Sequence, residues 1–365
     1  MHIIFAGGGT GGHIFPAIAV ANQIKTLKPE VSISFVGAVG GMEIEKVPQA
    51  GYPIDAINIS GIQRKKWWKN LILPLKIIRS LIQAQKILKH YQPAVVIGTG
   101  GYVSGPILFA ASRKGIPIVL IESNAFPGIT NKWLKNKANL ICVGSKAAIQ
   151  YFPKEKCIYT GNPVRSDISG QKKQEGLDYF HFSTQKKTVL VIGGSLGAGS
   201  INKAIASGLN TLMKQPVQII WQTGKVHYTY YQHYEKQYPE QLRVVPFIQD
   251  MNLAYSAADI IISRAGAISL AELAIVQKAT ILVPSPNVAE NHQFKNAKEF
   301  ADENAAVLIP DAQVQEDLVN EILNLISHEV VMQTLSNNII KFARPHATYQ
   351  IATKILELMN LYSKL

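Results

Sequence analysis

Residues 2–13 read HIIFAGGGTGGH, a short apolar run that leads directly into a glycine-rich turn and a helix-compatible segment. The same arrangement returns 186 residues later, where residues 188–199 read TVLVIGGSLGAG. A turn of this kind points backbone N–H groups and the positive end of a helix toward a bound group, and phosphate suits that environment. Two such units predict two similar α/β domains that face each other across a cleft.

Short β-rich runs alternate with helical patterns along both halves of the chain, which predicts α/β domains with doubly wound parallel sheets. Apolar periodicity is poor over residues 166–187, so we place the domain boundary after residue 165. The predicted domains are 1–165 and 166–343, and a helix within 344–365 is expected to pack back on the first. The predicted strands are His2–Ala6, Ser32–Val36, Ala94–Ile97, Pro117–Ile121, Leu140–Val143, Thr188–Ile192, Gln218–Trp221, Arg243–Val245, Ile260–Ile262 and Ile281–Val283.

The composition is that of an ordinary globular protein of 365 residues, with 47% hydrophobic and 17% charged residues, and it excludes collagen-like and disordered chains. Cys142 and Cys157 stand in strand-like contexts, which favours buried thiols in a reducing cytoplasm over a disulfide or metal pair. The first basic residue is Lys25, so no signal-peptide pattern is present. The long uncharged run 94–112 contains four glycines and Pro106, which predicts strand, loop and helix rather than a membrane span.

The excess of positive charge lies in the first half of the chain. Residues 1–165 hold 20 Lys and Arg against 6 Asp and Glu, a net charge of +14. Residues 166–365 hold 17 and 18, a net charge of −1. The first half is therefore expected to face an anionic partner, which is nucleic acid, acidic lipid or a phosphorylated substrate.

A basic and aromatic stretch, RKKWWK at 64–69, precedes an aliphatic loop and a helical run that ends at His90. Adjacent tryptophans among lysines fit an anionic membrane surface. Two other interpretations stay open: the helix packs on the sheet with solvated lysines, or the basic residues bind nucleic acid, although no nucleic-acid-binding motif accompanies them. The predicted membrane patch comprises Lys65, Lys66, Trp67, Trp68, Lys69, Leu71, Ile72, Leu73 and Leu75.

Gly7, Gly9 and Gly12 have the G-x-G-x-x-G spacing of dinucleotide-binding turns. That spacing predicts NAD only where an acidic residue ends the second strand and holds the ribose hydroxyls. Here the strand Val31–Val36 is followed by no acidic residue before Glu43. The redox-cofactor interpretation is therefore disfavoured, and a purely structural role of the glycines stays open.

Polar side chains come at or beyond the ends of several predicted strands, at Glu122–Asn124, Gly161–Arg165 and Arg264–Glu272. Each has a plain structural explanation, such as a hinge ion pair for Arg165 or a surface position for Glu272. The carboxyl ends of parallel strands share one edge of a sheet. The joint occurrence of these residues in both domains therefore favours a binding site.

Six motifs follow one another in order: GTGGH at 9–13, GYVSGP at 101–106, TNKWL at 130–134, GNPVR at 161–165, GGS at 193–195 and SRAGA at 263–267. With them the sequence resembles the MurG-type peptidoglycan glycosyltransferases over nearly its whole length. Departures from the family pattern stand at Ile121, Ser123, Leu196 and His292.

The resemblance implies a GT-B fold, in which the second domain mainly holds the sugar donor and the first holds a lipid acceptor. It implies transfer of N-acetylglucosamine (GlcNAc) from UDP-GlcNAc to the C4 hydroxyl of the N-acetylmuramoyl unit of lipid I, giving lipid II and UDP. Glu272 would hold the ribose hydroxyls, and the helix start at 267–271 would receive the diphosphate. The implied donor-binding residues are Thr10, Gly11, Gly12, Asn124, Arg165, Ser195, Ile248, Ala267, Ile268, Ser269, Leu270, Ala271, Glu272 and Gln293.

An α-linked donor and a β-linked product imply a single in-line displacement, which needs a base for the attacking hydroxyl and positive groups for the departing UDP. His13 is the expected base because it closes the first glycine turn at a helix start and titrates near neutral pH when unperturbed. Glu122 is the rival. Arg165 and the helix start near Gly266 are expected to stabilise the diphosphate. No Asp-x-Asp triplet occurs in the chain, so neither a catalytic metal nor another cofactor is expected.

The acceptor implied by the resemblance is a membrane lipid, so the protein is expected to be peripheral on the cytoplasmic face of the bacterial inner membrane. Its expected partners are UDP-GlcNAc, lipid I and the anionic lipid surface, with cell-wall synthesis proteins allowed and nucleic acid not expected. Three alternatives stay open: another lipid glycosyltransferase of the same fold, a UDP-GlcNAc 2-epimerase and a non-catalytic UDP-sugar-binding module.

Overall fold

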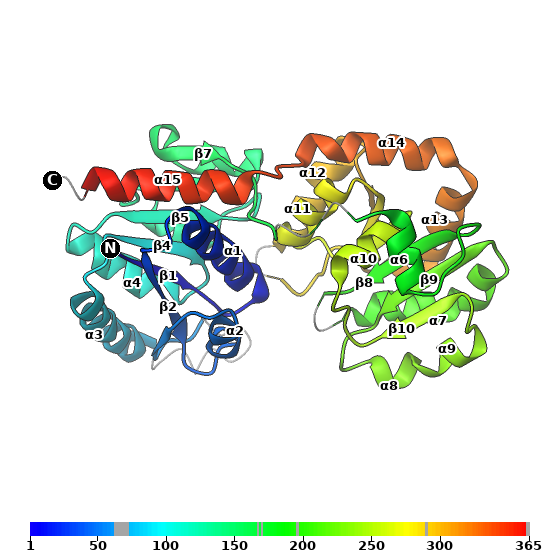
Figure 1. Cartoon of the computed structure of the whole chain (residues 1–365), viewed down its shortest axis with the longest axis horizontal. Helices are drawn as coiled ribbons and strands as arrows, with labels where there is room; N and C mark the ends of the chain where they lie inside the picture. Colours follow the sequence, from blue (N-terminus) through cyan, green and yellow to red (C-terminus); the bar gives the residue numbers. More distant parts are fainter. Residues whose placement is uncertain (62–72, 166–167, 169–170, 195–196, 289–290, 363–365) are drawn as a thin grey trace. The chain divides into compact units, whose positions relative to one another are not determined.

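The computed structural model describes residues 1–61, 73–165, 168, 171–194, 197–288 and 291–362 (Figure 1). The chain divides into two compact units. The first comprises Met1–Val164 together with Arg344–Leu365, and the second comprises Arg165–Ala343. The division therefore falls directly before Arg165, and the chain returns to the first unit at Arg344.

A seven-stranded parallel sheet forms the middle of the first unit, in the order β3-β2-β1-β4-β5-β6-β7. The winding direction reverses between β1 and β4, and open α/β sheets bind ligands at the carboxyl ends of the strands beside such a reversal. The strands are β1 (His2–Gly7), β2 (Ser32–Ala38), β3 (Ile54–Ile57), β4 (Val95–Gly100), β5 (Ile118–Glu122), β6 (Leu140–Val143) and β7 (Cys157–Tyr159).

Helices cover both faces of this sheet, so an apolar core lies on each side of it (Figure 1). Ile3, Ile4 and Phe5 of β1 are wholly buried, and β1 pairs in parallel with β2 and β4. A run of consecutive apolar residues suits a strand with both faces covered, because neither face meets water. The helices are α1 (Gly11–Leu27), α2 (Glu43–Gln49), α3 (Leu73–Tyr91), α4 (Ser104–Arg113), α5 (Ile129–Leu134) and the C-terminal α15 (Ala347–Tyr362).

The C-terminal helix α15 adds its apolar stripe to the core of the first unit. Ile351, Ile355 and Met359 recur at four-residue spacing and are wholly buried in the core to which α1 contributes. At its start, Thr348 Oγ1 donates a hydrogen bond of 3.0 Å to the Val164 carbonyl. The last part of the sequence thus completes the fold of the first.

The second unit repeats the plan with six parallel strands in the order β10-β9-β8-β11-β12-β13, and its winding reverses between β8 and β11. Its strands are β8 (Lys187–Ile192), β9 (Val217–Gln222), β10 (Leu242–Val245), β11 (Ile260–Ser263), β12 (Ala279–Leu282) and β13 (Val307–Leu308). Its α-helices are α6 (Lys173–Tyr179), α7 (Gly199–Met213), α8 (Tyr228–Tyr231), α9 (His233–Gln237), α10 (Met251–Ala257), α11 (Ala267–Val276), α12 (His292–Asp302), α13 (Val314–Ser327) and α14 (Glu329–Ile339).

The prediction of two doubly wound parallel-sheet domains is confirmed, and all ten predicted strands are present. The sequence does not predict β3, β7 and β13, which lie at the edges of their sheets and are largely half-buried, so their sequences form no distinct apolar run. The weakly periodic stretch 166–187 contains α6, and Leu177 of this helix is buried in the core of the second unit. Within the described part of the chain, no helix has both the length and the apolar content that a membrane crossing requires.

Candidate functional site

The glycine turn after β1 carries His13 at the carboxyl end of the first sheet. α1 begins at Gly11, so His13 lies in its first turn, and the His13 N–H donates to the Thr10 carbonyl at 3.1 Å. Thr10 and Gly12 are exposed, and His13 is half-buried. The imidazole packs against the backbone of Gly100, where a Cβ would lie 2.7 Å from Nδ1. Gly100 therefore leaves the space that the imidazole ring occupies.

Two hydrogen bonds join His13 to Thr99 at the end of β4. The imidazole Nδ1 lies 2.9 Å from the Thr99 carbonyl oxygen, and Thr99 Oγ1 donates to the His13 carbonyl at 2.7 Å. A carbonyl oxygen only accepts hydrogen bonds, so Nδ1 carries the proton. In the neutral ring Nε2 then holds the lone pair, which makes Nε2 the nitrogen that can accept a proton.

Glu122, at the end of β5, is buried and organises the loop that follows it. Its Oε1 accepts hydrogen bonds from the backbone and side-chain nitrogens of Asn124, at 3.0 and 3.3 Å. Its Oε2 accepts from the Gly128 N–H at 3.0 Å and from Asn131 Nδ2 at 2.9 Å. Three donors from the loop after β5 and one from α5 thus surround the carboxylate, an arrangement that suits a structural anchor.

A second buried carboxylate, Glu43 at the start of α2, lies beneath the glycine turn and was not predicted as a site residue. Its Oε2 accepts from the Gly9 N–H at 3.1 Å and its Oε1 from the Ala38 N–H at 2.9 Å. The Gly9 amide therefore points into the protein, and the sequence-based expectation that the first turn offers its amides to a phosphate does not hold at Gly9. Burial raises the pKa of Tyr102, whose ring lies beside Gly9, and the Glu43 charge adds to that rise.

In the second unit, Arg165, Tyr255 and Glu272 come together. Glu272 Oε2 accepts a hydrogen bond of 3.0 Å from the Tyr255 hydroxyl, and Glu272 Oε1 lies 3.8 Å from Arg165 Nε. Burial raises the pKa of Tyr255 well above its ordinary value, and the Glu272 charge adds to that rise, so the phenol remains a donor. The structure thus joins two predicted site residues and adds Tyr255, which the sequence did not predict.

Helix α11 presents its N-terminus beside this group. Its first internal hydrogen bond runs from the Leu270 N–H to the Gly266 carbonyl at 2.9 Å, so the amides of Ala267 to Ser269 lie at the positive end of the helix. Ala271 is half-buried, whereas the Leu270 side chain is 3% exposed and belongs to the core. Leu270 can therefore meet a ligand only through its backbone.

Gln222, at the end of β9, links two predicted donor-binding segments. Its Nε2 donates to the Gly194 carbonyl at 2.9 Å, and its Oε1 accepts from the Ile248 N–H at 3.0 Å. Ile248 itself is buried. Gln222 was not predicted, and the predicted Ser195 lies outside the described residues.

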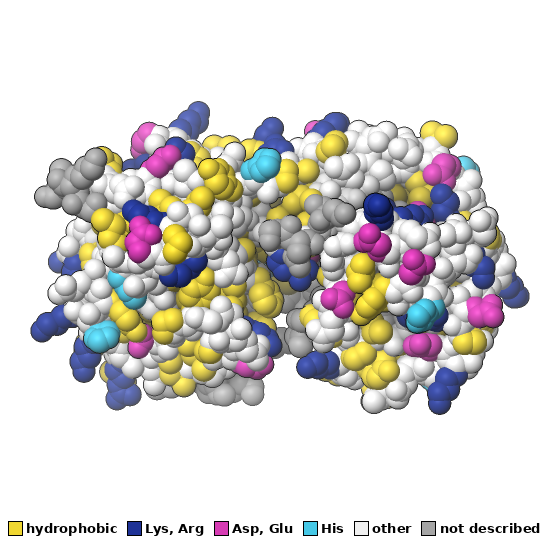
Figure 2. Space-filling view, in the orientation of Figure 1, with side chains coloured by type: hydrophobic (Ala, Val, Ile, Leu, Met, Phe, Trp, Pro, Cys, Tyr) yellow, Lys and Arg dark blue, Asp and Glu magenta, His cyan; other side chains and the backbone are white. Residues whose placement is uncertain are grey.

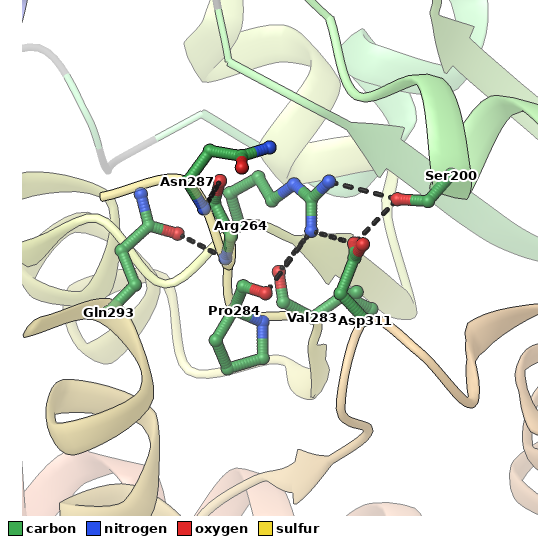
Figure 3. Close-up of polar contacts among 8 residues, drawn as sticks. Ser200, Arg264, Val283, Pro284, Asn287, Gln293 and Asp311 are labelled. Carbon is green, nitrogen blue, oxygen red and sulfur yellow. Dashed lines mark hydrogen bonds and ion pairs between the residues drawn. The ribbon is translucent and has the colours of Figure 1, made fainter. Parts of the chain in front are cut away.

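Arg264, which follows β11, joins the loops after β12 and β13 to the start of α7 (Figure 3). One terminal nitrogen, Nη1, donates to the Val283 carbonyl at 3.0 Å and pairs with Asp311, while Nη2 donates to Ser200 Oγ at 2.9 Å. In the same view, Gln293 Oε1 accepts a 2.9 Å hydrogen bond from the Ser285 N–H. Arg264 therefore braces the backbone directly before α11, and its partners are far apart in the sequence.

The described part of the predicted membrane patch is the start of α3. Leu75, Ile78 and Ile82 are 61%, 56% and 50% exposed, whereas Leu88 is buried. Ile78 and Ile82 thus lie apart from the face that packs on the protein, to which Leu88 belongs. Figure 2 shows Lys and Arg side chains gathered along the edge of the first unit where Figure 1 places α3. The predicted Lys65, Lys66, Trp67, Trp68, Lys69, Leu71 and Ile72 lie outside the described residues, as does the Leu73 side chain.

Both cysteines are free thiols on adjacent strands of the first unit; Cys142 is buried, as predicted, whereas Cys157 is half-buried. Burial raises the pKa of Cys142 to about 12, so this thiol stays protonated at physiological pH. No three His, Cys, Asp or Glu side chains within the described ranges are arranged to hold a metal ion.

Two family models match this chain. The glycosyltransferase family 28 N-terminal domain matches residues 3–143, and the family 28 C-terminal domain matches residues 188–350. The crystal structure of MurG from Acinetobacter baumannii is similar at 30% identity with a TM-score of 0.78, over 98% of this chain and 99% of that one.

Curated proteins are similar over almost the same length. One from Flavobacterium psychrophilum is 47% identical over 98% of this chain and 97% of its own, and one from Cytophaga hutchinsonii is 48% identical with the same coverage. Both are named UDP-N-acetylglucosamine--N-acetylmuramyl-(pentapeptide) pyrophosphoryl-undecaprenol N-acetylglucosamine transferase.

Proposed function

This chain belongs to glycosyltransferase family 28, and from that membership we propose that it transfers GlcNAc from UDP-GlcNAc to the C4 hydroxyl of the N-acetylmuramoyl unit of lipid I, which yields lipid II and UDP. The observation that carries the proposal is the 47–48% identity, over 98% of the chain, to transferases named for this reaction. The two doubly wound sheets match the GT-B fold that such a transferase requires.

In the proposed reaction, the C4 oxygen of the acceptor attacks C1 of the GlcNAc unit as the bond from C1 to the diphosphate oxygen breaks. The bonding electron pair leaves with UDP, and attack on the opposite face converts the α-linkage into a β-linkage. We assign the proton of the hydroxyl to His13 Nε2, since the hydrogen bond from Nδ1 to Thr99 orients the neutral ring with its lone pair there. Glu122 is assigned a positioning role, because the loop after it and the start of α5 together supply four donors to its carboxylate.

The donor is assigned to the second unit. Glu272, held by the Tyr255 hydroxyl, accepts hydrogen bonds from the ribose hydroxyls, and the first turn of α11 faces the diphosphate with its amides. Arg165, beside Glu272 and half-exposed, supplies a cation for the charge that grows on the departing UDP. Since these groups provide positive charge without an Asp-x-Asp motif, we propose that no divalent metal takes part.

The test is release of UDP from UDP-GlcNAc by the purified protein, with and without a lipid I analogue that carries a short polyprenyl chain. We expect acceptor-dependent release and a product extended by one GlcNAc, with the same rate in the presence of EDTA. Conversion of UDP-GlcNAc without acceptor would indicate an epimerase, and binding without release would indicate a UDP-sugar-binding module. A rate that fell in EDTA and returned with Mg²⁺ would contradict the metal-free assignment.

Tyr255→Phe tests whether the tyrosine hydroxyl holds Glu272 for the ribose. The ring stays to fill the core, so the variant folds, but Glu272 loses the donor at 3.0 Å. We expect the Kd for UDP, measured by calorimetry, to rise about 3- to 10-fold, less than the loss of a direct hydrogen bond to a charged group, because Glu272 itself remains and loses only the donor that orients it. Tyr238→Phe is the matched control, because that hydroxyl bonds to the exposed Asn210 instead. An unchanged Kd in Tyr255→Phe would remove this role.

We propose that the protein binds the anionic membrane surface peripherally, through the start of α3 and the basic stretch before it. The exposed Leu75, Ile78 and Ile82 lie among cations of the same helix, the composition of an interfacial helix. A polyprenyl-linked acceptor requires such a location, on the leaflet that presents lipid I.

Ile78→Ser combined with Ile82→Ser is expected to lower the fraction that sediments with anionic vesicles at least fivefold. The melting temperature should stay unchanged, because both side chains are at least half exposed. Charge reversal at Lys65, Lys66 and Lys69 should give a similar loss, since each basic residue near an acidic surface contributes about 1 kcal/mol. Val330→Ser is the control, because this 79% exposed valine lies in the second unit. Equal sedimentation of parent and variants, or binding that does not weaken with salt, would contradict the proposal.

A further inference from the structure

Glu43 is a buried charged group that the proposed reaction does not use. It is 0% exposed, and it receives hydrogen bonds from the backbone N–H groups of Gly9 and Ala38. Burial of a carboxylate is unfavourable unless hydrogen bonds or a cation compensate for the lost water. Here the compensation comes from the turn after β1 and from the last residue of β2, so the carboxylate holds these two segments to each other.

Both segments are built around this side chain, and glycine makes the room for it. A Cβ at Gly8 would lie 2.1 Å from Glu43 Oε1, and a Cβ at Gly37 would lie 2.5 Å from its Cγ. A Cβ at Gly41 would lie 2.4 Å from its Cδ. These positions therefore need glycine because of Glu43, without any ligand having to enter.

The turn that Glu43 holds packs against the segment of the first unit that contacts His13. The Gly8 carbonyl lies so close to Gly101 that a Cβ there would approach it to 2.4 Å, and the same Cβ would meet the His13 ring at 3.4 Å. The Tyr102 ring covers Gly9 on the other side. Glu43 thus packs against Gly8, Gly8 against Gly101, and Gly101 against the imidazole. The two middle residues are glycines, so these contacts are made by backbone atoms, which a change of side-chain rotamer cannot move.

We propose that Glu43 is a positioning residue that takes the place of a bound anion inside the first glycine turn and so holds the surface against which His13 packs. The Gly9 amide serves this internal carboxylate, which preorganises the turn before any substrate arrives. The expected effect on turnover rests on the proposed function. The structural link between Glu43 and the glycine turn does not depend on that function.

Glu43→Gln tests the link, with Glu45→Gln as the matched control on the same helix, where the side chain is 67% exposed. Glutamine has nearly the same shape but turns an NH₂ group toward one of the two N–H donors, so one hydrogen bond is lost. We expect backbone hydrogen exchange over residues 7–12 to rise about tenfold, with no change at 191–194 in the second unit. We also expect kcat to fall about tenfold while the Kd for UDP stays within twofold.

Gly41→Ala repeats the test without removal of the charge, because its Cβ would push the Glu43 carboxylate out of place. Gly40→Asn is its control: Gly40 has a φ of +77°, which asparagine tolerates, and its Cβ would meet nothing within 4 Å. We expect Gly41→Ala to reproduce both effects of Glu43→Gln. Parental exchange over residues 7–12 in either variant that folds would overturn the proposal, as would a kcat within twofold of the parent. Should the parent show no transferase activity, the proposed function fails and the exchange measurement still decides the role of Glu43.

Discussion

His13→Ala should lower kcat about 10³-fold and leave the Kd for UDP within twofold. Proton transfer by a positioned side chain contributes about 10²- to 10⁴-fold to a rate, and the His13 ring is oriented for that task by its Nδ1 hydrogen bond to Thr99. UDP affinity should persist because Arg165, Tyr255 and Glu272 belong to the second unit. The measurement is steady-state turnover with a lipid I analogue at saturating substrate, combined with calorimetry of UDP.

His13→Asn separates the base from the anchor. Asparagine retains an N–H near the position of Nδ1 but has no basic nitrogen, so an equal loss in both variants would assign the effect to proton transfer. His90→Ala is the control, since this exposed histidine ends α3. Recovery of most of the rate in His13→Asn would reduce His13 to an anchor, and retention of a tenth of kcat in His13→Ala would exclude it as the base.

The sequence predicts the sheets well because their signal is local. Parallel strands covered on both faces read as runs of apolar residues, so even Leu140–Val143 is predicted with its observed bounds. β13 and β7 have two and three residues and are half-buried strands at the edges of their sheets, so no apolar run marks them. Their pairing with a longer neighbour defines them, and such pairing depends on contacts that no local window contains.

The candidate site likewise has features that a local motif predicts and features that depend on distant contacts. His13 is predictable because a motif places it directly after the glycine turn, whereas the proton on Nδ1 depends on Thr99, 86 residues away. In the sequence, Glu43 serves only as evidence against a dinucleotide, because it lies beyond the end of the second strand and not at it. The path of the chain after β2 folds α2 back so that this acid lies beneath the turn.

Tyr255 and Gln222 were missed for a related reason. The sequence around Tyr255 indicates an aromatic residue in the core, and Tyr255 does lie there. Only the hydrogen bond from its hydroxyl to Glu272 shows a second role. Gln222 stands at the end of β9 without any motif. A glutamine or glutamate directly at the end of a predicted strand was therefore the available signal for Gln222, as it was for Glu122.

Glu272→Gln should raise the KM for UDP-GlcNAc about 10- to 100-fold and leave kcat at saturating donor within threefold. A hydrogen bond to a charged group contributes about 1.5 to 3 kcal/mol, and each 1.4 kcal/mol is a tenfold change in affinity. Loss of the ion pair with Arg165 explains little of this, because the pair is 3.8 Å apart and the Arg165 side chain is 48% exposed. The effect should therefore come from the ribose hydroxyls.

Comparison of UDP with 2′-deoxy-UDP by calorimetry identifies that source. The parent should bind the deoxy compound about tenfold more weakly, because Glu272 loses one of its two hydroxyl partners, whereas Glu272→Gln should bind both with nearly equal affinity. Glu303→Gln is the control, an exposed acid of the second unit that pairs with Lys341. If the variant still discriminated tenfold between the two nucleotides, the ribose contact would have to be assigned elsewhere in the second unit. Helix α11 carries Glu272 and also begins with the amides assigned to the diphosphate. Such a result would therefore leave α11 with the diphosphate role and without the ribose role.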